Sequence, residues 1–152
     1  MSVVGERAEG IRARVEAAWA PFRAAVPDRL DEPTAAGWTA KEMLAHVAFW
    51  DEAVVPVVVT MFRGEGLPAG WSFGSGDLGL ADGDWPVRDV HNAREAAWAR
   101  NRTPTEVLER ADRAHAGLVA LIGSLGDDEV AAHPEYFEDL GSHYLEHLRE
   151  LA

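Results

Sequence analysis

Apolar residues recur at steps of three and four along most of the chain, which is the spacing of one face of an α-helix. The first of these stripes predicts a helix over about Val4–Val26. In the second stripe, Thr39 and Glu42 form the pattern of a capping box, which satisfies free amide groups where a helix begins. We therefore predict a second helix over residues 39–61, bent at Pro56 because proline lacks a backbone donor.

The second half of the chain predicts helices over residues 86–100, 104–125 and 134–151. A second capping box, Thr103 with Glu106, marks the start of the middle one. No stretch alternates apolar and polar residues for long enough to require a strand. Four long amphipathic helices can bury their stripes together only as a bundle. We predict an all-α fold, a four-helix bundle with a short extra helix, and a single domain over residues 1–152.

Residues 63–85 interrupt this pattern with many glycines and with the aromatic residues Trp71, Phe73 and Trp85. A loop of this length inside a small domain is typical of a functional lid or of a disordered insertion. The three aromatic side chains are equally consistent with simple structural packing.

The charge and the cysteine content of the chain limit the classes of molecule that it is expected to bind. The chain has 152 residues, a formal charge of −12 at pH 7 and no cysteine. The negative charge repels phosphate backbones and anionic membrane surfaces, so we expect neither nucleic acid nor a membrane as partner. Met1–Gly10 is charged where a signal peptide is apolar, so we expect a cytoplasmic protein. Without cysteine, histidine and carboxylate are the strong metal ligands that remain.

Three of the six histidines are candidates for one metal site. His143 and His147 are four residues apart, so their imidazoles project from one helix face. His46 lies on or beside the core-facing stripe of the second helix. Three histidines from two helices would leave metal positions open for water or substrate, as in catalytic sites. The alternatives are a polar helix edge for the pair and a buried neutral histidine for His46.

Other polar residues are candidates for supporting roles. A carboxylate near the pair could accept the free imidazole N–H or a proton, and the sequence does not choose between Asp139, Glu146 and Glu150. Asn92, next to His91, could face the metal or cap a turn. We interpret His115 and His133 as surface residues.

Two familiar motifs are rejected. Residues 143–147 match H-x-x-E-H, but that protease pattern needs a third ligand well downstream, and few residues follow. Residues 74–79 match G-x-G-x-x-G without the preceding strand and following helix that a dinucleotide site requires.

Residues 37–50, GWTAKEMLAHVAFW, together with the terminal HYLEH, resemble the DinB/YfiT-like superfamily of metalloenzymes and the related mycothiol-dependent maleylpyruvate isomerases. The resemblance implies a four-helix bundle that binds zinc, nickel or iron through the positions of His46, His143 and His147. It also implies a low-molecular-weight thiol cosubstrate and a homodimer. The isomerases carry a further C-terminal domain for which we expect no room here.

We therefore predict a metal-dependent S-transferase for thiols of the mycothiol or bacillithiol type, acting on a small molecule. Glu146 is the candidate to accept the free N–H of a histidine ligand or to accept a proton, and Trp50 and Asn92 are candidates to line the cofactor pocket. A metal-dependent hydrolase and a non-catalytic stress or ligand-binding protein are the alternatives.

Overall fold

The predicted apolar stripes fold into helices whose first residues follow the capping signals. In the computed structural model, which describes residues 5–67 and 88–151, no strand forms in those ranges and an all-α fold is confirmed. The helices are α1 (Glu6–Ala25), α2 (Ala40–Phe49), α3 (Val55–Phe62), α4 (Arg88–Arg100), α5 (Pro104–Gly123), α6 (Asp127–Ala132), α7 (Pro134–Asp139) and α8 (Ser142–Glu150). A 3-10 turn, η1 (Pro27–Arg29), follows α1, and a π-helical turn, η2 (Trp50–Val54), joins α2 to α3.

Two threonine caps begin α2 and α5. The Thr39 hydroxyl accepts a hydrogen bond from the backbone N–H of Glu42 at 3.2 Å, and Thr103 accepts one from Glu106 at the same distance. Each cap satisfies a backbone donor that the helix itself leaves free, worth about 1 kcal/mol. Both predicted helix starts are confirmed.

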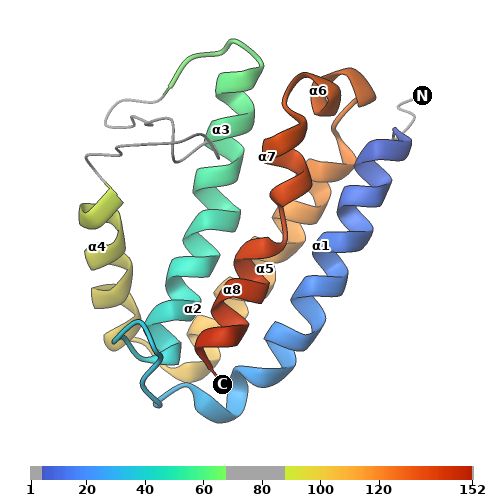
Figure 1. The fold of residues 1–152 in the computed structure, drawn as a ribbon. Coiled ribbons are helices and arrows are strands. Elements are labelled where there is room, and N and C mark those ends of the chain that lie inside the picture. The colour runs from blue at the N-terminus through green and yellow to red at the C-terminus, as the bar shows by residue number, and fades with distance from the viewer. Residues whose placement is uncertain (1–4, 68–87, 152) are drawn as a thin grey trace.

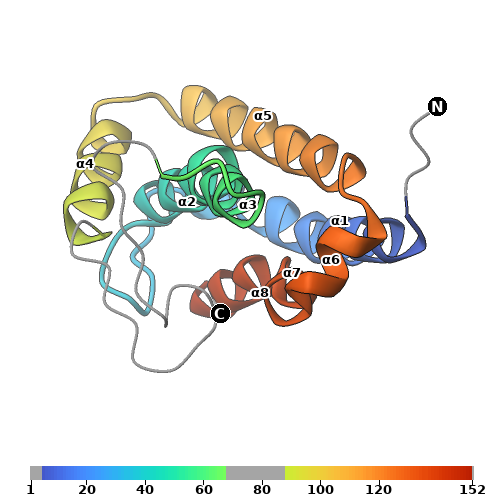
Figure 2. The same cartoon turned by 90° about the horizontal axis from the view of Figure 1, so that it is seen from above.

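The segments α2, η2 and α3 form one continuous rod in the middle of the bundle (Figures 1 and 2). Helix α2 packs against α4 and α5, while α1 packs against α5 and α8. These contacts bury one large core, to which α1, α2, α5, α7 and α8 all contribute, and a smaller cluster of Phe49, Val54 and Val58. The largest fully buried side chains of the large core include Phe22, Met43, Leu44, Ile122, Phe137 and Tyr144.

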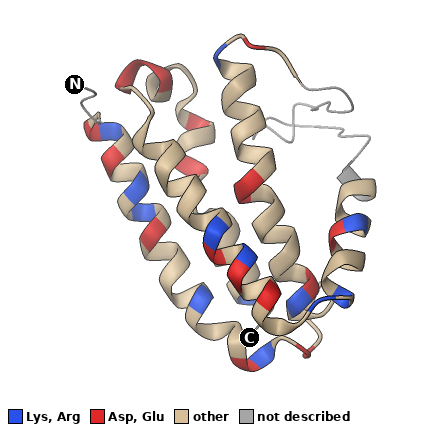
Figure 3. Ribbon diagram, turned by 180° about the vertical axis from the view of Figure 1, so that it is seen from behind, with Lys and Arg blue, Asp and Glu red and all other residues tan. Residues whose placement is uncertain are grey.

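The central rod is apolar for most of its length. Ala40–Phe62 is long and apolar enough to cross a membrane by length and composition alone, but 67% of its most apolar window is buried inside the fold. Figure 3 shows that Lys, Arg, Asp and Glu lie mainly on the surrounding helices. The hydropathy of the rod is that of a core helix.

The widening at η2 directly precedes Pro56. Proline cannot donate to the carbonyl four residues earlier, and its ring crowds that carbonyl, so the helix accommodates it with a wider turn. The predicted irregularity therefore takes the form of a π-helical turn. This turn changes the direction in which the side chains after His46 project.

The predicted single helix over residues 134–151 is wrong, because it is divided into α7 and α8. Gly141 separates them with a φ of +98°, a conformation that favours glycine. A Cβ atom at this position would lie 3.3 Å from the Cα of Val15. The break thus lets the chain pass close to α1 and sets the direction of α8.

The connection between α5 and α7 contains a short helix, α6, for which the sequence analysis predicted no element. The predicted loop at 63–85 falls mostly within residues 68–87, so Trp71, Phe73 and Trp85 lie outside the described residues.

Candidate metal centre

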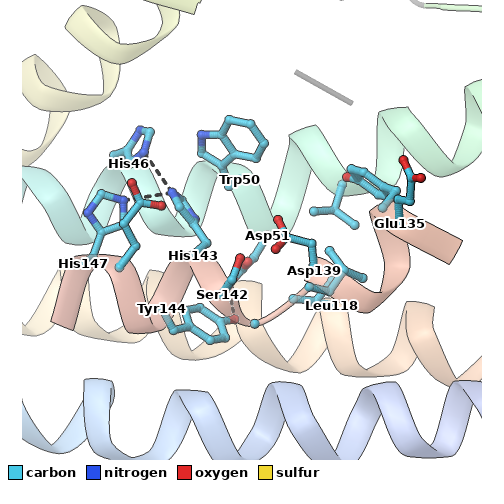
Figure 4. A pocket seen from close by; sticks show the side chains of 15 residues that line it. His46, Trp50, Asp51, Leu118, Glu135, Asp139, Ser142, His143, Tyr144 and His147 are labelled. Carbon is cyan, nitrogen blue, oxygen red and sulfur yellow. Dashed lines mark hydrogen bonds between the residues drawn. The ribbon is translucent and has the colours of Figure 1, made fainter. Parts of the chain in front are cut away.

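Three imidazoles from two helices meet at one end of a cavity (Figure 4). His46 projects from α2, and His143 and His147 project from successive turns of α8. The Nε2 atom of His143 lies 3.2 Å from Nε2 of His46 and 2.9 Å from Nε2 of His147. One nitrogen of each ring lies within 4.8 Å of the other two.

The hydrogen bonds of the Nδ1 atoms show which tautomers of His46 and His147 are present. Nδ1 of His46 lies 3.0 Å from the side-chain oxygen of Asn92, and Nδ1 of His147 lies 2.7 Å from a carboxylate oxygen of Glu150. Both oxygens are acceptors, so each Nδ1 carries the hydrogen and donates it. The Nε2 atoms of His46 and His147 are therefore left with free lone pairs that point toward His143.

This arrangement fits a metal ion better than it fits three isolated histidines. A proton on Nε2 of His143 can serve only one of its two close contacts at a time. A metal ion can accept all three lone pairs, and nitrogens bound at about 2.0–2.1 Å lie roughly 3 Å from one another. The donor set therefore fits a divalent metal, and the three histidines could hold one.

Burial keeps His46 and His143 neutral. His46 is 8% exposed and His147 is 5% exposed. Burial, together with the nearby His147, lowers the pKa of His46 to about 4. Burial and the two neighbouring imidazoles also hold the pKa of His143 well below its usual value. Neutral imidazole is the form that binds metals, so His46 and His143 are in that form at pH 7.

The cavity beside the histidines has a volume of about 770 Å³. In Figure 4 the histidines gather at one end of it, while Glu135 and Asp139 lie toward the other. The Trp50 ring forms part of the wall, with its centroid 5.3 Å from that of His143. Three histidine ligands facing an open space of this size are typical of a catalytic metal site, since structural sites are closed by a fourth protein ligand.

A family comparison agrees with this geometry. The family model described as the DinB superfamily matches residues 7–150, nearly the whole chain. The chain belongs to the DinB superfamily. Comparison with curated proteins and with solved structures gives no significant match.

The DinB cavity also holds a buried carboxylate that the sequence analysis missed. Asp51 is 5% exposed, lines the cavity and accepts a hydrogen bond from the hydroxyl of Tyr144. The Tyr144 oxygen in turn lies 2.8 Å from Nδ1 of His115. Since the hydroxyl hydrogen points to Asp51, His115 donates to Tyr144.

His115 is therefore not the surface residue that we predicted. It is half-buried on α5, and its ring stacks on Trp19 with centroids 4.3 Å apart and planes 8° apart. His133 is also half-buried, because it stacks on Phe62 at 3.6 Å. Both rings have aromatic partners on other segments, which the local sequence does not reveal.

The other candidate residues of this DinB protein differ in their contacts with the histidines. Of the three carboxylates, Glu150 accepts a hydrogen bond from His147, whereas Glu146 and Asp139 are exposed residues of the cavity wall. Asn92 faces His46 from α4, and Trp50 lines the cavity. Their roles toward a cofactor stay predictions.

Proposed function

We propose that this DinB superfamily protein is a metal-dependent S-transferase for low-molecular-weight thiols. The observation that carries the proposal is the convergence of three histidine nitrogens at one end of a cavity of about 770 Å³. A small molecule can enter that cavity and reach the side of the cluster that no protein ligand covers.

His46, His143 and His147 would hold the metal. When bound there, a divalent metal supplies Lewis acidity, which lowers the pKa of a thiol that approaches it. Asn92 and Glu150 fix the tautomers of His46 and His147, so both rings keep their lone pairs toward the cluster. Burial keeps His46 neutral.

The sulfur would come from outside the protein. The chain contains no cysteine, so no side chain can form a protein thiolate or a thioether intermediate. An external thiol of the mycothiol or bacillithiol type would provide the nucleophile. It would attack an electrophilic carbon of the second substrate, and the leaving group would depart with the bonding electrons.

The second substrate would lie along the apolar part of the cavity. Val55, Leu118 and Leu140 line it together with the ring of Tyr136. This surface favours a carbon skeleton beside the nucleophile and gives little support to a highly charged electrophile.

Turnover of 1-chloro-2,4-dinitrobenzene tests the proposal. We expect the zinc-loaded protein to accelerate formation of the thioether with 2-mercaptoethanol, and we expect the His46→Ala variant to lose that acceleration. The matched control is His133→Ala, because His133 lies outside the cluster and the large cavity. Release of dinitrophenol at a rate independent of thiol would contradict the proposal and indicate a hydrolase.

A further inference from the structure

Asp51 is a buried carboxylate to which the proposed reaction assigns no role. Tyr144 donates to one of its oxygens, and among the described residues no other side chain bonds to the Asp51 carboxylate. The carboxylate lies in the cavity that also contains His46, His143 and His147 (Figure 4). It is the buried acid of this cavity, since Glu135, Asp139 and Glu146 are exposed.

The π-helical turn explains why Asp51 reaches the cavity. Asp51 follows His46 by five positions, and in a regular α-helix residues at this spacing project about 140° apart. The turn at Trp50–Val54 has more residues per turn, which reduces that angle and brings both side chains to one side of the rod. Turns of this kind inside α-helices are frequent at functional sites.

The Asp51 side chain is positioned by a chain of hydrogen bonds through Tyr144 and His115. Tyr144 comes from α8, the helix of His143 and His147, and is 1% exposed. His115 lies on α5 and donates a hydrogen bond to the Tyr144 oxygen at 2.8 Å, and its ring stacks on that of Trp19. Three helices therefore meet in one hydrogen-bonded chain that ends at the cavity.

No lysine or arginine is among the described residues that line the cavity, so no basic side chain compensates a charge on Asp51 there. The titratable groups near it are Glu52 on its own element, Tyr136 on α7 and Tyr144 on α8. Burial raises the pKa of Asp51 to about 7, the hydrogen bond from Tyr144 opposes this rise, and the charge of Glu52 adds to it. Such a carboxylate can both take up and release a proton near neutral pH.

We propose that Asp51 is the proton acceptor for the thiol in this cavity and thus a catalytic residue, with Tyr144 and His115 as positioning residues. This inference rests on the proposed S-transferase function. The S–H bond of the thiol breaks, the sulfur keeps the electron pair as a thiolate, and the proton forms a new O–H bond on Asp51. Nothing is oxidised or reduced, and Asp51 can then give the proton to the departing group or to solvent.

The protonation of Asp51 can be followed without any substrate. In the metal-free protein, a pH titration of the aspartate carboxyl carbons by ¹³C NMR should show one signal with a midpoint near 7. The Asp51→Asn variant should lack this signal, and Asp139→Asn, which changes an exposed carboxylate of the same cavity, should retain it. A midpoint below 5 for Asp51 would overturn the proposal.

The Tyr144→Phe variant tests the positioning role. It keeps the buried ring but removes the hydroxyl that stabilises the ionised carboxylate. The Asp51 midpoint should move to higher pH, by on the order of one unit. A role limited to packing predicts no movement, and that result would remove Tyr144 from the proposal.

The deciding experiment follows the rate of thioether formation from 2-mercaptoethanol and 1-chloro-2,4-dinitrobenzene by the zinc-loaded protein as a function of pH. A proton acceptor must be ionised to act, so the wild-type rate should rise with pH through the Asp51 midpoint near 7. The Asp51→Asn variant should lack this rise and be slower by about 10²-fold at pH 7.5, and it should recover at higher pH, where the thiol ionises without an acceptor. The same pH profile in both proteins would overturn the acceptor role alone. Absence of thiol-dependent turnover in both would instead contradict the proposed function, and the acceptor role would fall with it.

Discussion

His46 and His147 each donate a hydrogen bond from Nδ1, which leaves the lone pair of Nε2 available to a metal ion. Asn92 and Glu150 are the acceptors, at 3.0 and 2.7 Å. Each hydrogen bond fixes a tautomer, orients a ring and makes its free nitrogen more basic. We therefore expect the affinity of the cluster for a metal to depend also on Asn92 and Glu150, which would not touch the metal.

Removal of these acceptors should weaken metal binding. We expect Asn92→Ala and Glu150→Ala each to lower zinc affinity by roughly 10–100-fold, because the imidazoles lose their orientation. Competition with a chromogenic chelator measures this affinity. Glu146→Ala is the matched control, since Glu146 lies on the same helix but is exposed. An equal loss of affinity in the control would contradict the assignment of Glu150.

The sequence could indicate the three histidines but not their supporting carboxylate. Spacing of four residues places His143 and His147 on one face, and the apolar stripe of α2 points to His46. Glu146 follows His143 by three residues, and Glu150 follows His147 by three, so spacing cannot separate the two carboxylates. The choice depends on burial and on side-chain rotamers, which only the folded structure defines.

Two irregular backbone positions shape the cavity at the level of the elements. The turn η2 directs Asp51 into the cavity that the histidines also line, and Gly141 sets the course of α8 beside α1. Regular helices in both places would give the same apolar stripes and a different arrangement of polar side chains. For this reason Asp51, which lies outside the predicted stripe, could not be recognised from helical periodicity.

The Gly141→Ala variant should destabilise the protein by on the order of 1–3 kcal/mol. The added methyl group meets a φ of +98° and the Cα of Val15 at 3.3 Å, so the backbone or α1 must shift. Gly117→Ala is the matched control, because Gly117 lies inside α5 with open space around it and should gain roughly 0.5–1 kcal/mol. Chemical denaturation measures both changes, and a neutral Gly141→Ala would contradict the account of the break.

The folded protein buries two titratable groups, His46 and Asp51, whose contributions to stability change with pH in opposite directions. The lowered pKa of His46, about 4, means that its contribution to stability is present above about pH 6.5 and is lost as the pH falls through 4. The raised pKa of Asp51, about 7, means that its contribution is present below about pH 4 and is lost as the pH rises through 7. Burial of the side chain is the main cause of both shifts.

We therefore expect the two effects to offset each other between about pH 4 and 6.5 in the metal-free protein. The Asp51→Asn variant should remove the loss that accompanies ionisation of Asp51, so at pH 9 it should be more stable than wild type by about 2–4 kcal/mol. Denaturant titrations at several pH values measure the free energy of unfolding. A constant difference between the two proteins from pH 4 to pH 9 would contradict the raised pKa of Asp51.

The metal content of the purified protein tests the central claim most directly. After loading with zinc and removal of excess ion, elemental analysis should find about one zinc per wild-type chain and per His133→Ala chain. The His46→Ala variant should retain little, because two histidines on α8 hold a metal weakly without the third ligand. A wild-type protein without zinc, or a His46→Ala variant with the same zinc content, would contradict the three-histidine metal centre.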